Sequence, residues 1–305
     1  MFQPFNIQYL HHHEINKVKW DNCLDKADNG LIYGYSFYLD HMARHWDALV
    51  LNNYQAVMPL TWNKKYGIHY LYQPFLCAQL GVFGKNIDTE ISKAFLKAIP
   101  SKFKYWDIYL NHQNILHLKD FDLYLRNNFV LNLNLTYDDL YKGYRENVKR
   151  NVKKAYQFGC VAQTGFSVEQ VIELAQEQMK SYSVKKIDFE NFRKLYHLLR
   201  KKKQAVTYGI FKKDQLLASC VFFFSHNRAY YILVGNHPDG RTMGASHALI
   251  DAFIKNNAAT NLLLDFEGSD IRDLAFFYSS FGAIDERYAA VRLNHLPRYL
   301  KWIKK

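Results

Sequence analysis

The chain has 305 residues, which is enough for two domains of ordinary size. Hydrophobic residues make up 49% of it and charged residues 22%, a composition typical of globular proteins and not of disordered ones. No apolar run approaches the roughly 20 residues that span a bilayer, and the first residues lack the basic and apolar pattern of a signal peptide. We therefore expect a cytoplasmic protein without stable membrane insertion.

The formal net charge is +12, and most of it lies in the second half. Residues 1–135 carry 13 Lys and Arg against 11 Asp and Glu, whereas residues 136–305 carry 27 against 17. Such an excess predicts an anionic partner, for example a nucleotide cofactor, a tRNA or a phosphorylated acceptor.

Several catalytic and metal-binding motifs do not occur. No two of the four cysteines are close enough in sequence for a CxxC motif or a local zinc site. His41 and His45 are one helical turn apart but have no third ligand at a matching spacing, so no metal is expected. GxSxG, HExxH, Walker A and GxGxxG motifs are also missing, which leaves hydrolase, zincin, NTPase and Rossmann functions without support.

Hydrophobic periodicity and turn residues predict the elements of the first half. In chain order they are a strand at 6–10, helices at 14–26 and 36–45, strands at 47–52, 54–62 and 68–72, a helix at 89–99, a strand at 105–110, a helix at 118–126 and a strand at 129–135.

The second half repeats this order of elements. It is predicted to have a strand at 160–164, helices at 168–182 and 189–203, strands at 205–211, 216–224 and 229–235, a helix at 243–256, a strand at 261–266, a helix at 272–281 and a strand at 283–294. Both halves therefore follow the order βααβββαβαβ, without evident sequence identity between them. This order resembles that of the GNAT fold, an α/β (α+β) fold with a mixed, mostly antiparallel sheet flanked by helices. We expect two GNAT-like domains, at residues 1–136 and 137–305.

A long amphipathic helix is predicted over residues 138–158, between the two halves. Its apolar residues recur with helical periodicity and are expected to pack between the halves. Basic residues occupy its other faces, and a further basic run follows at 200–203. Four of these residues are candidates for binding an acceptor or a tRNA. They are Lys149, Arg150, Lys153 and Lys154.

The strongest local signal for a ligand follows the predicted strand at 229–235. Arg241 precedes small residues that open an apolar helix, and unpaired N–H groups at a helix start attract anions. The guanidinium adds two parallel donors for a phosphate. The candidate cofactor-binding residues are Val234, Gly235, Arg241, Thr242, Met243, Gly244, Ala245 and Ser246. The segment resembles the R-x-x-G-x-G/A pyrophosphate loop of GNAT enzymes, whose donor is acyl-CoA. In the first half, Gly81 and Gly84 precede the helix without a matching arginine, so only one donor site is expected.

Amine acylation needs a proton acceptor, donors for the oxyanion and a proton for the leaving group. Candidate catalytic residues near the carboxyl edge of the second sheet are Asp265, Glu267 and Tyr278. The GNAT resemblance implies an acid role for Tyr278. It also implies splayed central strands, which would leave backbone N–H groups near Val234 and Gly235 free to bind the oxyanion.

Short motifs along nearly the whole chain resemble the FemAB-type transferases. They lie at 147–155 with Gly159, at 244–255 with 264–268, at 276–282, and upstream at 57–60, 73–74 and 79–83. Ser279 stands where the family has a lysine, and the long coiled-coil arm of some members has no counterpart. Characterised members transfer an amino acid from aminoacyl-tRNA to a cell-wall precursor amine, and relatives in the superfamily use acyl-CoA.

Three functions follow as hypotheses. The first is a GNAT-type N-acyltransferase that uses acyl-CoA on an amine acceptor in a cleft between the two halves. The second is a FemAB-type, aminoacyl-tRNA-dependent transferase acting on a cell-wall or peptide precursor. The third is a non-catalytic nucleic-acid-binding module. The sequence gives no indication of a required protein partner for any of these functions.

Overall fold

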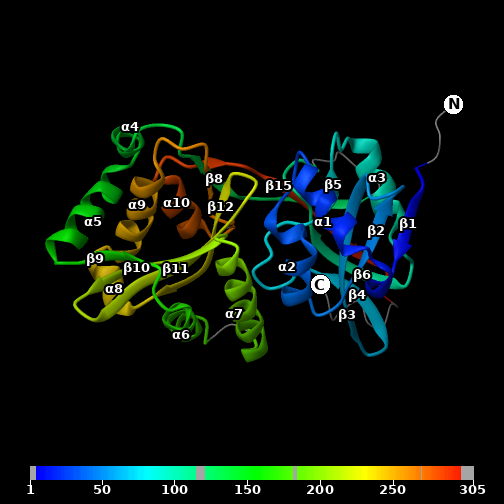
Figure 1. Cartoon of the computed structure of the whole chain (residues 1–305), viewed down its shortest axis with the longest axis horizontal. Coiled ribbons are helices and arrows are strands. Elements are labelled where there is room, and N and C mark those ends of the chain that lie inside the picture. The colour runs from blue at the N-terminus through cyan, green and yellow to red at the C-terminus, as the bar shows by residue number, and fades with distance from the viewer. Residues whose placement is uncertain (1–4, 115–120, 181–183, 269, 297–305) are drawn as a thin grey trace. The chain divides into compact units, whose positions relative to one another are not determined.

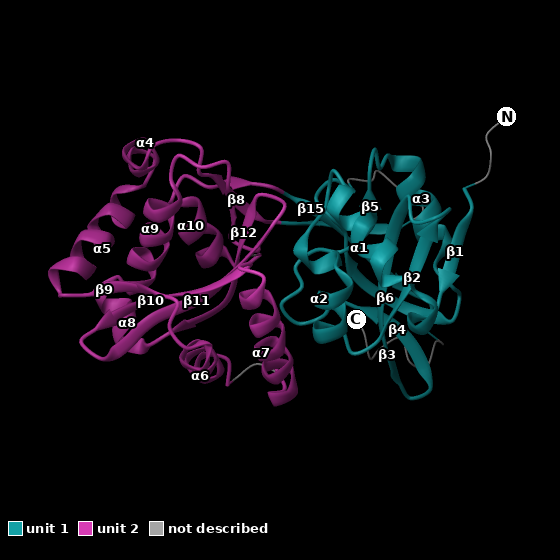
Figure 2. Ribbon diagram, in the orientation of Figure 1, with its two compact units in different colours: residues 1–126, 287–305 teal, residues 127–286 magenta. Residues whose placement is uncertain are grey.

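The computed structural model describes residues 5–114, 121–180, 184–268 and 270–296 (Figure 1). The chain divides into two compact units (Figure 2). Unit 1 comprises residues 1–126 and 287–305, and unit 2 comprises residues 127–286. Each unit is built on a sheet of its own, which helices flank.

Unit 1 contains a mixed, mostly antiparallel sheet with the strand order β1-β2-β3-β4-β6-β15-β7, and β5 pairs with β3. Its parallel strand pair is β4 with β6. The elements are β1 (Ile7–Leu10), η1 (His12–Glu14), α1 (Lys17–Lys26), η2 (Ile32–Gly34), α2 (Ser36–Met42), β2 (Trp46–Leu51), β3 (Ala56–Lys65), β4 (Ile68–Tyr72), β5 (Phe83–Gly84), α3 (Thr89–Ala98), β6 (Phe103–Tyr109), β7 (Asp122–Arg126) and β15 (Tyr288–Asn294).

The core of unit 1 explains why these segments form strands and helices. Every residue of β2 is buried, as expected for a strand covered on both faces. Phe95 and Leu96 of α3 belong to the same buried cluster as Leu49 and Ile108 of the sheet. Asn16 caps α1 by accepting a hydrogen bond from the Lys19 N–H at 3.0 Å.

Unit 2 contains a seven-stranded sheet, counted over its described residues, in the order β14-β8-β13-β12-β11-β10-β9. Its parallel strand pair is β12 with β13. The elements are β8 (Phe129–Asn132), α4 (Tyr137–Lys142), α5 (Glu146–Gln157), β9 (Val161–Thr164), α6 (Val168–Gln178), α7 (Lys186–Lys201), β10 (Ala205–Lys212), β11 (Gln215–Ser225), β12 (Arg228–Asn236), α8 (Pro238–Met243), α9 (Ala245–Asn257), β13 (Leu263–Asp265), α10 (Arg272–Ser279) and β14 (Ile284–Asp285).

Helices cover both faces of the unit 2 sheet. Phe222 and Phe223 are neighbours in β11, so their side chains point to opposite faces. Phe222 stacks on Phe253 of α9 with ring centroids 3.7 Å apart, whereas Phe223 stacks on Phe192 of α7 at 5.5 Å. The helices α9 and α7 therefore lie on opposite sides of the sheet.

The predicted domain boundary, between residues 136 and 137, differs from the boundaries of the two units. The last described strand, β15, leaves unit 2 and pairs with both β6 and β7 of unit 1. In turn, β8 belongs to unit 2, because it pairs with β13 and β14. A sequence pattern identifies a strand but not its partners, so neither exchange was predicted.

Two predicted helices also differ from the structure. Residues 122–126 form strand β7 instead of a helix, and the preceding part of that prediction, 118–120, lies outside the described residues. The predicted helix 138–158 is two helices, α4 and α5, which are separated at Gly143. The apolar residues Val148, Val152 and Ala155 of α5 pack in the core of unit 2. They were expected to pack between the halves.

Within the described residues, no helix combines the length and apolar character needed to cross a membrane.

Candidate donor site

Strand β12 of unit 2 contains a bulge. Val234 pairs with Cys220 and Ile232 with Val221, so the intervening Leu233 has no partner in β11. Leu233 has a φ of 46°, in the left-handed region that residues other than glycine seldom adopt. A bulge bends the strand and changes the direction of the backbone groups beside it.

The other edge of β12 separates from β13. The two strands pair only from Arg228 to Tyr230, opposite Leu263–Asp265. Among the described strands, none pairs with this edge over residues 231–236. The structure therefore contains the splay between central strands that the GNAT resemblance implied, and strand pairing leaves the outer backbone groups of residues 231–235 available to a ligand.

A cavity of about 290 Å³ lies at this free edge. It is lined by parts of α6, β12, α8, α9 and α10, and five of the predicted site residues are in its wall. They are Val234, Arg241, Gly244, Ser246 and Tyr278. A second cavity of about 490 Å³ shares Gln178, Asn236 and Arg241 with the first. The shared residues make the two cavities adjoining parts of one groove in unit 2.

The predicted donor loop is a short helix followed by a longer one. Arg241 lies in α8, and Gly244 joins α8 to α9 with a φ of +79°. A Cβ atom on Gly244 would lie 2.4 Å from the backbone oxygen of Asn151 in α5. The glycine is therefore required by its backbone conformation and by the approach of α5. A bound phosphate is therefore not needed to explain a glycine at this position.

Four other predicted cofactor-binding residues do not line the cavity. Gly235 packs against α6, where an added Cβ would be 2.7 Å from the backbone nitrogen of Ala175. Thr242 is exposed, and its Oγ1 donates to the Asp239 carbonyl at 2.9 Å. Met243 and Ala245 pack in or against the hydrophobic core of unit 2.

Asp265 is part of a buried ion pair. Its Oδ2 lies 2.6 Å from Nη1 of Arg228, and their side chains are 2% and 8% exposed. Arg228 also contacts Glu286 at 2.8 Å. Although burial alone would lower the pKa of Arg228, the charges of Asp265 and Glu286 raise it further above its usual range. The Asp265 carboxylate thus holds β12 and β13 together, and it does not line the cavity.

Glu267 is likewise absent from the lining of the cavity. Its backbone N–H donates to Oδ1 of Asp265 at 2.8 Å, and its φ is 64°. The sequence pattern placed both carboxylates at the carboxyl edge of the sheet, because Asp265 ends β13 and Glu267 follows two residues later. Of the three predicted catalytic side chains, only Tyr278 lines this cavity.

Tyr278 forms part of an aromatic wall. Its ring stacks on Phe266 with centroids 4.8 Å apart and meets Tyr231 edge-on at 6.3 Å. Burial raises the pKa of Tyr278, so the phenol keeps its proton at neutral pH. A protonated phenol at this position has the chemistry of a proton donor.

Sequence reasoning missed His247, in the first turn of α9, which also lines the cavity. The imidazole contacts Phe277 edge-on at 4.8 Å, and burial lowers the pKa of His247 to about 4. It is therefore neutral at pH 7. Its position directly after Ser246 was the available signal, but it stands within an otherwise apolar helix.

Two amide side chains were also missed, Asn236 at the end of β12 and Gln178 at the end of α6. Asn236 accepts a hydrogen bond from the Ser246 hydroxyl at 2.7 Å. The backbone N–H of Asn236 donates to Oε1 of Gln178 at 2.7 Å. These contacts connect α6, β12 and α9 around the groove and fix the orientation of its polar groups.

The four predicted acceptor- or tRNA-binding residues lie on α5 and outside the wall of the cavity. Lys149 is half-buried and forms an ion pair with Glu146 at 2.9 Å. Arg150, Lys153 and Lys154 are exposed. Within the part of the chain that the structure describes, no group of three or more His, Cys, Asp or Glu side chains is arranged to hold a metal ion.

Comparisons with known proteins identify the fold. The family model for the acetyltransferase (GNAT) domain matches residues 142–273. No curated protein matches the chain.

Three solved structures are similar over most of the chain. FemX is 12% identical, with a TM-score of 0.64 and coverage of 98% of this chain and 100% of FemX. The C-terminal domain of a putative lysylphosphatidylglycerol synthetase from Agrobacterium fabrum is 9% identical, with a TM-score of 0.54 and coverage of 90% and 91%. A tandem GNAT protein from the clavulanic acid biosynthesis pathway is 9% identical, with a TM-score of 0.51 and coverage of 96% and 99%.

These matches identify the fold of the chain. The structure consists of two GNAT-like domains, each a mixed, mostly antiparallel sheet flanked by helices, which confirms the predicted fold class. The chain has the fold of the FemAB-like, tandem GNAT proteins, and its GNAT domain indicates an acyltransferase.

Proposed function

We propose that the protein is an N-acyltransferase that takes an acyl group from acyl-CoA and transfers it to an amine. The observation that carries this proposal is the groove of unit 2. It combines a free strand edge, a cationic side chain and a proton-bearing phenol in one place. Unit 1 is proposed to lack a donor site, because the segment with Gly81 and Gly84 that precedes its helix α3 contains no matching arginine.

The groove suggests a division of roles. Arg241 is exposed at the junction of the two cavities and would pair with the donor's phosphates. The free edge of residues 231–235 would bind the amide groups of the pantetheine arm in the manner of an added strand. In this arrangement the thioester would lie along β12 near Tyr278.

In the reaction, the neutral amine attacks the thioester carbonyl, the C–N bond forms, and the C–S bond breaks. Backbone N–H groups beside Val234 are proposed to stabilise the oxyanion, and Tyr278 to donate a proton to the leaving thiolate. The proton lost from the amine nitrogen passes to water, and solvent later returns a proton to Tyr278. Neutral His247 supplies a hydrogen-bonding group to the same cavity.

A second candidate function is aminoacyl transfer from aminoacyl-tRNA. The surface of α5 favours it, because Arg150 and Lys153 are exposed and have no ion pair within the described residues. Two exposed cations on one helix face can contact phosphates of a nucleic acid. An aminoacyl ester would then take the place of the thioester, while Tyr278 kept its proposed role.

Calorimetric titration with CoA and acetyl-CoA tests the first proposal. We expect one site per chain and an affinity that falls about tenfold in Arg241→Ala, equivalent to about 1.4 kcal/mol. The matched control is Arg272→Ala, since Arg272 is exposed but does not line the groove. No binding of either compound at millimolar concentration would reject acyl-CoA as the donor. Aminoacyl-tRNA would then be tested by transfer of a labelled amino acid to amine acceptors.

A further inference from the structure

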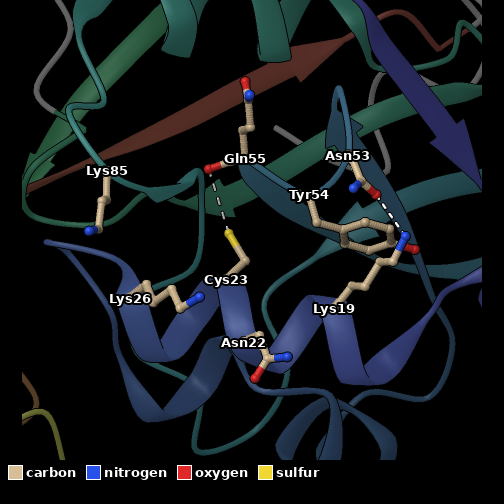
Figure 3. A pocket seen from close by; sticks show the side chains of 8 residues that line it. All are labelled: Lys19, Asn22, Cys23, Lys26, Asn53, Tyr54, Gln55 and Lys85. Atoms are coloured by element: carbon tan, nitrogen blue, oxygen red, sulfur yellow. Dashed lines mark hydrogen bonds between the residues drawn. The ribbon is translucent and has the colours of Figure 1, made fainter.

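Unit 1 contains a pocket of about 540 Å³ that none of the proposed chemistry uses (Figure 3). One wall is formed by α1, the opposite wall by the hairpin that joins β2 and β3, and Lys85 stands beside them. All eight lining residues belong to unit 1, whereas the donor groove belongs to unit 2. The pocket is therefore a separate site.

The charges around this pocket have one sign. Lys19, Lys26 and Lys85 line it, and no Asp or Glu is among the lining residues. Within the described residues, Lys26 and Lys85 have no ion pair, and the Nζ of Lys19 donates to Oδ1 of Asn53 at 2.8 Å. Like charges gathered around a concave surface repel one another, and a bound anion relieves that repulsion.

The remaining lining side chains are mostly neutral and polar. Cys23 is buried, and its Sγ lies 3.7 Å from the Gln55 carbonyl oxygen. Burial raises the pKa of the Cys23 thiol to about 11, so it adds no negative charge at neutral pH. Asn22, Asn53 and Gln55 supply amide groups that can donate hydrogen bonds. No lining side chain carries a negative charge that would repel an anion at neutral pH.

Two hydrogen bonds hold the hairpin wall in place. Tyr54 has a φ of 63°, which is unusual for a residue with a bulky side chain. Its hydroxyl accepts a hydrogen bond from the Asn16 N–H at 2.8 Å, which ties the hairpin to the start of α1. A second contact, from Nδ2 of Asn52 to Oε1 of Gln55 at 2.7 Å, stiffens the turn. A positive φ is common in hairpin turns, so these contacts show only that the hairpin wall of the pocket is held in place beside α1.

We propose that this pocket binds a small phosphorylated molecule, with Lys19, Lys26 and Lys85 around its phosphoryl groups. Lysine ammonium groups bind phosphate as point charges. The volume lies in the range of small-molecule sites and exceeds what a single phosphate needs. The rest of the ligand would lie against the Tyr54 ring and the amide side chains. A neutral apolar ligand would leave the ammonium groups of Lys26 and Lys85 without a charged partner.

Pyrophosphate is the probe for this site, and the full-length chain is used throughout. Titrations are made in an Arg241→Ala background, so that the donor groove contributes little. The test variant adds Lys26→Gln and Lys85→Gln. The matched control adds Lys97→Gln instead, because Lys97 is an exposed lysine of the same unit outside the pocket. Hydrogen exchange with and without pyrophosphate locates the site, and thermal unfolding verifies that each variant is folded.

We expect saturable binding that weakens with added salt, with slowed exchange in residues 16–27 and 52–56. The double lysine variant is expected to bind at least tenfold more weakly, since each lost ammonium contact typically costs about threefold to tenfold in affinity. The Lys97→Gln control should bind like its background. Equal binding by the test variant and the control would overturn the proposal, as would protection confined to unit 2. Absence of pyrophosphate binding at millimolar concentration would also overturn it.

Discussion

Replacing Asp265 by Asn removes one charge from a buried ion pair and nearly preserves the shape of the side chain. The partner, Nη1 of Arg228, lies 2.6 Å from the carboxylate and is shielded from water. Removing one member of a buried pair typically costs 3–5 kcal/mol, because the other charge remains buried. Glu286 stays within 2.8 Å of Arg228 and compensates in part. We therefore expect a loss of about 3 kcal/mol in the free energy of unfolding, at the low end of that range.

The assay is thermal unfolding, followed by circular dichroism. For a domain of this size, 1 kcal/mol corresponds to roughly 2–4 °C in Tm, so Asp265→Asn should lower the Tm by about 6–12 °C. The matched control is Asp214→Asn, in the exposed turn between β10 and β11, which should change stability by no more than about 0.5 kcal/mol. Acyl transfer is measured well below both transitions, where the Asp265 variant should retain most of its rate.

The result that would refute this reasoning is an Asp265→Asn variant that melts with the wild type but has lost acyl transfer. Asp265 would then act in the chemistry, as the sequence suggested, and the ion pair with Arg228 would contribute little. Loss of stability together with full activity per folded molecule supports the structural role.

Four further outcomes are expected. Tyr278→Phe should reduce kcat about a hundredfold with acetyl-CoA while shifting stability by less than 1 kcal/mol, because only a proton donor is lost. His247 has a folded-state pKa of about 4 against an ordinary 6.5, so its contribution to stability is complete above pH 6.5 and is lost as the pH falls toward 4. By pH 4.5 that loss is about 2.5 kcal/mol, so in urea unfolding at pH 7 and pH 4.5 the wild type should lose about that much more stability than His247→Gln. Gly244→Ala should destabilise the protein by more than about 1 kcal/mol, measured by urea unfolding, since alanine is strained at positive φ. Arg150→Glu with Lys153→Glu should weaken binding of bulk tRNA more at low salt than at high salt if α5 binds nucleic acid, and should leave CoA affinity unchanged.

The central hairpins of unit 2 were the easiest part of the fold to predict. Strands predicted at 205–211, 216–224 and 229–235 are observed at Ala205–Lys212, Gln215–Ser225 and Arg228–Asn236. Their turns are short, and Lys213, His226 and Asn227 adopt positive φ there. Both the strand pattern and the turn residues are local signals, so the sequence contains nearly all the information needed.

The partner of the last strand was not predictable in this way. Residues 283–294 have a pattern that favours one strand, and the preceding helix suggested continuation in the second sheet. In the structure, only β14 (Ile284–Asp285) stays in that sheet, where it pairs with β8. In the structure, β15 inserts between β6 and β7, more than a hundred residues earlier in the chain. Strand pairing at that separation depends on packing and loop closure, which periodicity does not encode. The absence of a helix at 122–126 has the same origin, because β7 is an edge strand stabilised by β15.

The candidate site was predictable in position but less so in residue roles. A cation and a small residue after a strand located the groove, and Arg241, Gly244, Ser246 and Tyr278 do line it. The role of Asp265 was not accessible, because a carboxylate after a strand looks the same whether it faces substrate or Arg228. That distinction depends on a partner 37 residues away.

The segment at 147–155 has two properties that the sequence could not separate, namely its FemAB-like motif and its basic charge. In the structure, the backbone oxygen of Asn151 approaches Gly244 so closely that no Cβ fits between them. The motif therefore helps to position the start of α9, a role that depends on backbone packing and needs no charge. Lys153 lies on the exposed side of α5, away from the buried Val152. Because packing and charge reside on different faces, reversing the charge of Lys153 tests the surface of α5 alone. A loss of CoA affinity in that variant would mean that the two roles are coupled through the helix.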